Sequence, residues 1–106
     1  MLAAHPDIDL FFNEADDMAV GCAHAVLLGQ SKASLIGIGG SKLAVAAIKA
    51  GRITGTICYK PEALGALAFD ALYAEATGKG RQRAAFLTYP TPGVTRADVG
   101  RCVGQW

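Results

Sequence analysis

The residues best suited to chemistry stand together early in the chain, at the end of a short apolar run. Residues 8–12 end in two aromatic side chains, and Asn13, Glu14, Asp16 and Asp17 follow them. Carboxylates and amides at one turn can form an acid–base pair or bind a polar ligand. Adjacent helical residues point about 100° apart, so Asp16 and Asp17 do not form a carboxylate pair. The pattern favours a strand followed by a helix that Asn13 caps, with an acidic first turn at the positive helix end.

Two further strand-to-helix junctions carry candidate residues. Residues 37–42 read Gly-Ile-Gly-Gly-Ser-Lys, and the backbone N–H groups of such a turn can cradle a phosphate. The segment matches neither of the two glycine-rich phosphate-binding patterns, so a tight turn is the simpler interpretation. At residues 56–61, Tyr59 is expected at the end of a strand, either stacking on a ligand or lying half-buried. Open α/β sheets bind ligands at the carboxyl ends of their strands, where all three junctions belong.

The three cysteines, Cys22, Cys58 and Cys102, are odd in number and show no Cys-x-x-Cys spacing. Only His5 and His24 could join them in a metal site, so we expect no metal and no cofactor. Free cysteines are among the most buried residue types in proteins. We therefore expect three small thiols, each buried or half-buried.

Apolar runs alternate with helical patterns along the chain. We expect strands at residues 8–12, 34–38, 53–59 and 84–89. We expect helices at residues 13–28, 41–50 and 61–77, and a short terminal helix after a capping box at residues 95–98. Strands that alternate with helices require a parallel sheet. The sequence therefore predicts one α/β unit, residues 1–106, with a parallel sheet flanked by helices in the order βαβαβαβ and a short C-terminal helix.

Each of the three longer helices has an apolar face that we expect to pack on the sheet. These faces consist of Ala15, Met18, Ala19, Cys22 and Val26 in the first helix, Leu43, Ala44, Ala47 and Ile48 in the second, and Leu64, Leu67, Ala68, Ala71 and Leu72 in the third. A glycine follows each helix, at Gly29, Gly51 and Gly78. We expect these glycines to take the left-handed conformation that ends many helices.

Composition excludes several classes of protein. The formal net charge is +1, so no basic field is available for binding nucleic acid. The apolar fraction of 52% is too high for a disordered chain. No apolar run approaches the length of about 20 residues that spans a bilayer, and no basic-then-apolar signal segment opens the chain.

Three segments together resemble a known family. Residues 5–9 lead to 16–21, residues 37–40 lead to 47–51, and residues 54–57 lead to Pro61 and 65–72. In this order and spacing they resemble the C-terminal part of periplasmic sugar-binding proteins of the ribose/galactose type, and residues 93–99 extend the resemblance. Those proteins are the substrate-binding subunits of ABC transporters. The resemblance implies a type I periplasmic binding fold, no enzymatic activity, a carbohydrate ligand, and a permease partner and periplasmic location for the full-length protein.

The resemblance also implies a ligand-binding wall. Its residues here are Asn13, Glu14, Asp16, Gly39 and Tyr59. Three polar ligand-binding residues of ribose-type members are replaced in this sequence. Ala15 occupies the position of a sugar-binding Asn, Gly39 that of an Asp and Tyr59 that of a Gln. Each lost hydrogen bond to a charged partner costs roughly 1.5–3 kcal/mol. The expected ligand is therefore a sugar or polyol other than ribose, or one that offers more apolar surface to Tyr59.

Family members are much longer and have two lobes, so the resemblance implies a C-terminal fragment. Residues 1–58 resemble part of the C-terminal lobe, and residues 61–106 resemble the returning helix, strand and tail. Such a fragment exposes apolar edges, and we expect it to form a single flavodoxin-like sheet or to pair with another copy. Without the opposite wall, high-affinity sugar binding is not expected. Two other functions stay open: the effector-binding part of a LacI-type repressor, which shares the fold, and a flavodoxin-like scaffold that binds no ligand.

Overall fold

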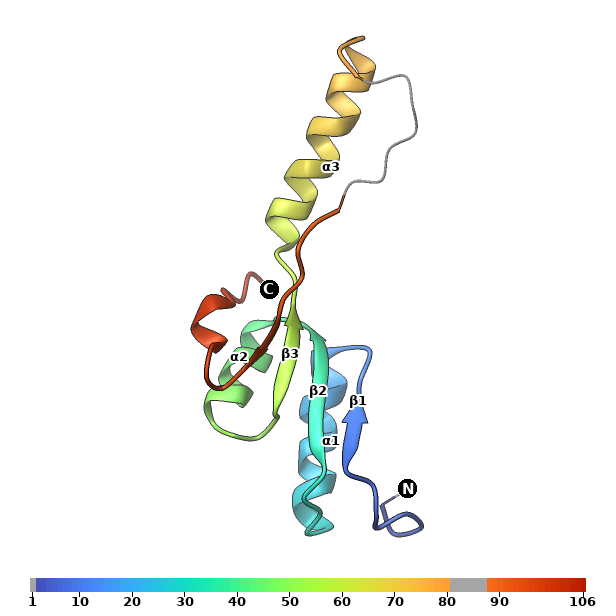
Figure 1. The fold of residues 1–106 in the computed structure, drawn as a ribbon, viewed down its shortest axis with the longest axis vertical. Helices are drawn as coiled ribbons and strands as arrows, with labels where there is room; N and C mark the ends of the chain where they lie inside the picture. The colour runs from blue at the N-terminus through green and yellow to red at the C-terminus, as the bar shows by residue number, and fades with distance from the viewer. Residues whose placement is uncertain (1, 81–87) are drawn as a thin grey trace.

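A computed structural model of the chain describes residues 2–80 and 88–106. Strands and helices alternate from the N-terminus, as Figure 1 shows. The elements are β1 (Leu10–Phe12), α1 (Asp16–Leu28), β2 (Ser34–Gly39), α2 (Lys42–Lys49), β3 (Gly55–Cys58), α3 (Pro61–Ala76), β4 (Gly93–Thr95) and the 3-10 helix η1 (Val99–Arg101). The predicted order βαβαβαβ with a short C-terminal helix is confirmed.

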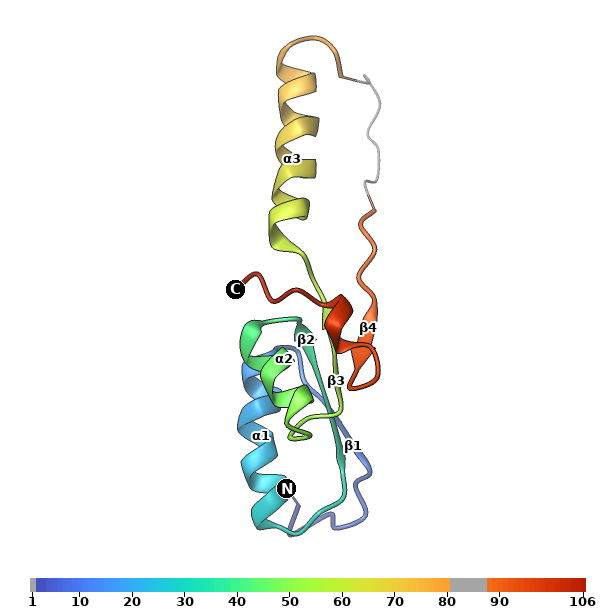
Figure 2. The ribbon, with the colours of Figure 1, turned by 90° about the vertical axis from the view of Figure 1, so that its left-hand side faces the viewer.

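The strands form one four-stranded sheet in the order β1-β2-β3-β4. β1, β2 and β3 run parallel, with Phe11 beside Leu35 and Ile38 beside Ile57. α1 and α2 lie on the same face of this sheet (Figure 2). The α/β fold class with flanking helices is confirmed, and the predicted parallel arrangement holds for β1, β2 and β3.

The last strand differs from the expectation in place and direction. Most of the strand predicted at residues 84–89 lies outside the described residues, and Thr88 and Tyr89 are not in a strand. β4 instead pairs antiparallel with β3, placing Val94 beside Thr56. The chain leaves the sheet beyond the carboxyl end of β3 and returns at that same end (Figure 2), so its next strand must run in the opposite direction.

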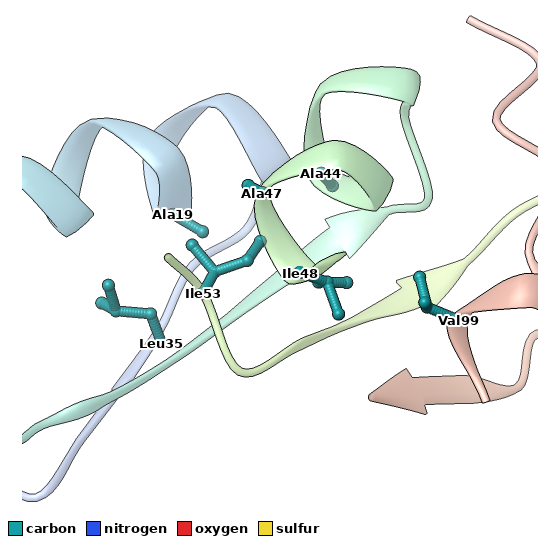
Figure 3. Close-up of a cluster of buried hydrophobic side chains, with 7 residues drawn as sticks. All are labelled: Ala19, Leu35, Ala44, Ala47, Ile48, Ile53 and Val99. Carbon is teal, nitrogen blue, oxygen red and sulfur yellow. The ribbon is translucent and has the colours of Figure 1, made fainter. Parts of the chain in front are cut away.

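The core lies between the sheet and the helices α1 and α2. Figure 3 shows its seven buried residues: Ala19, Leu35, Ala44, Ala47, Ile48, Ile53 and Val99. Three of them are alanines on α1 and α2, and such small side chains let two helices approach each other and the sheet closely. The predicted inward positions at Ala19, Ala44, Ala47 and Ile48 are confirmed.

Two residues that were predicted to face the core, one on α1 and one on α2, are exposed. Met18 is exposed because the inward face of α1 centres on Ala19 and Val26, which lie to one side of it. Leu43 is 46% exposed, because it stands in the first turn of α2 and points to a hollow at the edge of the sheet.

The helix ends agree with the glycine pattern in two of three places. Gly51 and Gly78 have φ angles of 72° and 71°, as expected for left-handed helix stops. Gly29 has a φ of −78°, so that prediction is wrong. Gln30 takes the positive angle instead, with a φ of 50°, because the chain makes its reversal one residue later. At the C-terminal end, Asp98 accepts a hydrogen bond from the Thr95 backbone N–H at 2.7 Å, as a capping box requires. The helix η1 begins only at Val99, so the prediction that this box caps it is wrong.

α3 projects from the sheet as an arm (Figure 1). None of its 16 residues, all of which the structure describes, is buried. Leu64 and Leu72, predicted to face inward, are exposed, as are Phe69 and Tyr73. The radius of gyration is 17.9 Å, whereas a compact domain of this length has about 13 Å. The predicted inward face of α3 is therefore wrong, because the segment after Cys58 leads away from the sheet (Figure 1).

The cysteines also differ from the expectation. Cys58, at the end of β3, forms a disulfide with Cys102, which follows η1. Cys22 alone is a free thiol, and it is half-buried. The expectation of three free thiols was wrong because two cysteines 44 positions apart meet when the chain returns to the sheet. Within the described parts of the chain, no helix is both long and apolar enough to cross a membrane.

Candidate functional site

Asp16 joins the three strand-to-helix junctions at the carboxyl edge of the sheet. Its Oδ1 accepts a hydrogen bond from the Thr56 hydroxyl at 2.6 Å, and its Oδ2 accepts one from the Ser41 backbone N–H at 2.7 Å. The side chain is only 3% exposed. A Cβ at Gly37 would lie 2.6 Å from Asp16 Oδ1, so only glycine leaves room for this carboxylate. Asp16 therefore braces α1 against β3 and the turn before α2, and both of its oxygens already hold protein donors.

Asn13 has a different task from the one predicted. α1 begins at Asp16, two residues later than an Asn13 cap requires, and Ala15 occupies the capping position without a side-chain hydrogen bond. The Asn13 amide donates to the Ile36 carbonyl at 3.1 Å, and its Oδ1 accepts from the Cys22 thiol at 3.4 Å. The capping prediction was wrong, because Asn13 ties the end of β1 to β2. Asp16 and Asp17 do form the predicted acidic first turn of α1.

The glycine turn before α2 directs its N–H groups into the protein. Gly39 and Gly40 have φ angles of 145° and 73°, a conformation that favours glycine. The Gly40 N–H donates to the Thr56 hydroxyl at 3.2 Å, and the Ser41 N–H donates to Asp16. The Lys42 N–H donates to the Trp106 carbonyl at 2.9 Å. The tight-turn interpretation is confirmed, since these donors are occupied and do not form a phosphate cradle.

The Gly39 carbonyl accepts hydrogen bonds from two aromatic residues. It accepts a hydrogen bond from the Tyr59 backbone N–H at 3.0 Å and one from the Trp106 indole N–H at 3.3 Å. Tyr59 follows β3 with its side chain exposed, and Glu14 is exposed on the turn after β1. The structure thus brings Asp16 and Gly39 into contact. Of the five predicted ligand-binding residues, Asp16 alone lines the hollow at this edge of the sheet.

That hollow has a volume of about 260 Å³ and lies at the carboxyl edge of the parallel strands. Its lining consists of Ala15, Asp16, Asp17, Ile38, Ser41, Leu43 and Trp106. It combines carboxylates and a hydroxyl with apolar side chains and one large aromatic ring. Among the described residues, every buried side-chain nitrogen or oxygen atom has a hydrogen-bond partner. The polar network beneath the hollow is therefore complete, and free hydrogen-bonding capacity remains on its more exposed rim.

A larger hollow of about 680 Å³ opens at the other end of the sheet. It is lined by the C-terminal half of α1, the segments that lead into β2 and β3, the end of β4 and the two residues after it. Ligands of open parallel sheets bind at the carboxyl ends of the strands, not at their amino ends. We therefore take the smaller hollow as the candidate site. Within residues 2–80 and 88–106 no group of three or more His, Cys, Asp or Glu side chains is placed to hold a metal ion.

Sequence reasoning missed the contributions of Thr56 and Trp106. A polar residue within an apolar strand was the available signal for Thr56, whose hydroxyl is buried against Asp16. Trp106 is the one tryptophan of the chain, but no local pattern indicates that the tail returns to Gly39. That contact spans 67 positions and depends on the path of the whole chain.

Comparison with known proteins identifies relatives of this site and fold. The family model of the periplasmic binding protein domain matches residues 1–80. The ribose import binding protein RbsB of Bacillus subtilis is 37% identical over 71 residues, which cover 67% of this chain and 23% of that protein. RbsB of Haemophilus influenzae is 34% identical over 67 residues, covering 63% of this chain and 23% of that protein. The chain thus spans about a quarter of the length of these relatives.

Solved structures extend the likeness to almost the whole chain. An ABC transporter periplasmic solute-binding protein from Actinobacillus succinogenes, with bound D-allose, superposes with a TM-score of 0.80 at 25% identity, covering 94% of this chain and 35% of that one. An ABC transporter solute-binding protein from Mycobacterium smegmatis, with bound glycerol, gives a TM-score of 0.81 at 29% identity, covering 99% and 36%. The predicted family is confirmed: the chain belongs to the periplasmic binding protein domain family.

Proposed function

We propose that this chain forms one wall of a sugar- or polyol-binding site in the substrate-binding component of an ABC import system, and that it carries no catalytic activity. The observation that supports this most is the hollow at the carboxyl edge, whose lining includes Asp17, Ser41 and Trp106. Carboxylate and hydroxyl oxygens accept hydrogen bonds from sugar hydroxyls. An aromatic ring covers the apolar face of a sugar. The import and solute-binding roles of the relatives favour transport over a repressor.

The ligand class follows from the three replaced ligand-binding residues. Ala15, Gly39 and Tyr59 cannot supply the polar contacts expected of a ribose site, and Ala15 adds apolar surface to the hollow. The solved neighbours hold D-allose and glycerol, which supports a hexose or a small polyol as the ligand. Among the predicted ligand-binding residues, Asp16 lines the hollow, and Gly39 is proposed to act beneath it through its contact with Trp106. Asn13, Glu14 and Tyr59 are proposed to reach a ligand only at its margin.

The two lobes implied by the resemblance are also part of the proposal. Residues 2–58 and 93–106 pack together around one sheet, while α3 stands away from it. We propose that α3 belongs to a second lobe of the full-length protein, which acts with a permease in the periplasm. The exposed apolar residues of α3 support pairing with another copy when that lobe is absent. Analytical ultracentrifugation tests the pairing, and a monomer at all concentrations contradicts it.

Thermal denaturation with paired enantiomers tests the binding function. Sugars stabilise proteins nonspecifically by exclusion from the surface, and two enantiomers do so equally. Specific binding adds a further stabilisation that depends on the ratio of ligand concentration to Kd. We expect D-allose to raise the Tm above the value in L-allose, and Asp17→Asn to reduce this difference. Lys49→Ala, an exposed change at the far end of α2, is the control that keeps it. Equal Tm values for both enantiomers of allose, ribose, galactose and glucose contradict the proposal.

A further inference from the structure

We propose that the C-terminal tail, residues 102–106, supplies the specificity-determining aromatic wall of the candidate site, with Trp106 selecting ligands that have an apolar ring face. The Cys58–Cys102 disulfide fastens this tail to the end of β3. This inference rests on the proposed function and adds to it the side chain that discriminates between ring-shaped and open-chain ligands. Its two parts, the placement of the indole and the ligand preference, are testable separately.

The tail is fastened along its whole length. Cys102 is bonded to Cys58 at its start. Gly104 lies against α2 so closely that a Cβ there would be 2.8 Å from the Lys42 backbone nitrogen. At the end, the Trp106 carbonyl accepts the Lys42 N–H at 2.9 Å. The tail therefore closes the start of α2, and its position is set by covalent, packing and hydrogen-bonding contacts together.

A fourth contact joins the tail to the beginning of the arm. The Gln105 side chain accepts a hydrogen bond from the Glu62 backbone N–H at 3.1 Å and donates one to the Glu62 carboxylate at 3.2 Å. Glu62 lies in the first turn of α3, directly beyond the carboxyl end of β3. The tail thus runs between the sheet and the arm, along the edge where the hollow opens (Figures 1 and 2).

The Trp106 indole packs against Gly39 and is hydrogen-bonded to it. The Trp106 Nε1–H donates to the Gly39 carbonyl at 3.3 Å. A Cβ on residue 39 would lie 3.1 Å from Trp106 Cζ2 and 2.8 Å from Asp16 Oδ2. A side chain at this position would therefore compete with the indole for the same space. Because Gly39 has no side chain, the Trp106 indole can occupy this space. An aromatic surface thus stands where ribose-type members are expected to have an Asp.

The ring remains available to a ligand. Trp106 is 60% exposed although two hydrogen bonds hold it, and it lines the hollow together with Asp17 and Ser41. A pyranose placed there can stack its C–H face on the indole and direct hydroxyl groups to the carboxylate and the hydroxyl. Glycerol has hydroxyl groups but no ring face. Loss of the indole should therefore weaken binding of a pyranose more than binding of glycerol.

The single tryptophan makes the first test direct, because the chain has one indole N–H signal in a ¹H–¹⁵N NMR spectrum. We expect D-allose to shift this signal together with the Ser41 amide. Trp106→Ala should lower the affinity for D-allose at least fivefold, measured from the Ser41 shift, and change that for glycerol less than twofold. Val103→Ala, an exposed change in the same tail, should leave both affinities unchanged.

The outcomes separate this inference from the proposed function. If the Ser41 amide shifts with D-allose while the indole signal stays fixed and Trp106→Ala binds normally, the inference is wrong and the proposed function stands. An equal loss of affinity for D-allose and glycerol in Trp106→Ala also contradicts it. If no signal at the carboxyl edge shifts with any sugar or polyol, the proposed function fails, and the ligand preference fails with it.

The second test needs no ligand. Dithiothreitol supplies the two electrons and two protons that convert the Cys58–Cys102 bond into two thiols, and it is itself oxidised to a cyclic disulfide. We expect reduction to increase acrylamide quenching of Trp106 fluorescence, while the amide signals of Ala44 and Ile48 show that the sheet remains folded. Cys58→Ser/Cys102→Ser should behave like the reduced protein, and Cys22→Ser like the oxidised one. Unchanged quenching and an unmoved indole signal after reduction show that the disulfide does not hold the tail.

Discussion

α2 and α3 follow successive strands and have similarly apolar sequences, but their surroundings differ completely. α2 buries Ala44, Ala47 and Ile48 in the core, whereas none of the 16 residues of α3 is buried. The turn before α2 reverses the chain at Gly39 and Gly40, so the helix returns along the sheet. The segment before α3 continues away from β3. The comparison teaches that an apolar pattern predicts a helix, and that the turn before it decides what the helix packs against.

The two helices should also differ in how they are stabilised. α2 has a Ser41 cap, whose hydroxyl accepts the Ala44 N–H at 3.1 Å, and it packs on the sheet. Beyond its first turn, where Gln105 binds Glu62, α3 depends on its own backbone hydrogen bonds and on contacts between neighbouring turns, such as the stacked rings of Phe69 and Tyr73. A single helix of this length is only marginally stable in water. The sheet with α1, α2 and the tail is therefore expected to unfold as a unit, and α3 to open before it.

The disulfide gives the largest expected effect, because it closes the excursion of the chain through α3. Its cysteines are 44 positions apart, and a loop of this length corresponds to about 4 kcal/mol by the chain-entropy estimate. We expect Cys58→Ser/Cys102→Ser to lower the free energy of unfolding by roughly this amount in urea denaturation, with Cys22→Ser as the control. A change no larger than that of the control would show that the disulfide does not constrain the unfolded chain.

Truncations in the two helices test the comparison itself. Ile48 is fully buried, and Ile48→Ala should cost about 2–5 kcal/mol because it leaves a cavity in the core. Leu72 is 72% exposed on α3, and Leu72→Ala should change the stability by less than about 0.5 kcal/mol. Urea denaturation of both variants measures the difference. Equal losses would mean that α3 packs against something in solution, a second copy included.

Asp16 is a buried polar residue in the same packed part of the molecule as the buried apolar residue Ile48. Asp16→Asn replaces one acceptor oxygen by an NH₂ group, so the Thr56 hydroxyl or the Ser41 N–H loses its partner. A lost hydrogen bond to a buried charged group costs about 1.5–3 kcal/mol. Asp17→Asn, one position along and exposed, is the matched control and should be close to neutral. If the two variants have equal stability, Asp16 does not brace the site.

Gly65→Ala should have the smallest effect on stability, and it tests whether α3 unfolds independently of α2 and the sheet. Gly65 lies within α3 with nothing near its missing side chain, so alanine should stabilise the helix by about 1 kcal/mol. Amide hydrogen exchange should slow in residues 66–76 and stay unchanged in α2. The midpoint of urea denaturation should not move, because α3 opens independently. A rise in that midpoint would show that α3 and the sheet unfold together.

Local patterns were sufficient to predict the order of elements and much of the core. The alanines of α1 and α2 follow helical spacing, and the parallel strands end where glycine and polar residues begin. The helix predicted at residues 41–50 does begin at Ser41, whose hydroxyl accepts the Ala44 N–H as a cap. These features depend on residues within one turn or strand of each other, which is the range over which a single sequence is informative.

The features of the site that escaped prediction depend on contacts between distant segments. Asn13 satisfies the rules for a helix cap, but its amide binds β2, 23 positions away. The pairing of Cys58 with Cys102 and the seat of Trp106 on Gly39 exist only because the chain returns from α3 to the same end of the sheet. No periodicity or spacing in the sequence indicates that the chain comes back from α3 to the sheet. The acidic first turn of α1 was predicted, whereas the inward role of Asp16 was not.

The measurement that tests the central claim most directly is a ¹H–¹⁵N NMR titration of the whole chain with D-allose, with L-allose as the control. The account predicts that D-allose shifts the signals of Asp17, Ser41, Leu43 and the Trp106 indole at the carboxyl edge. L-allose should leave them in place, and the signals of residues 64–76 in α3 should not move with either enantiomer. Shifts confined to α3 or to the opposite end of the sheet, or identical shifts with both enantiomers, would contradict a carbohydrate site at this edge.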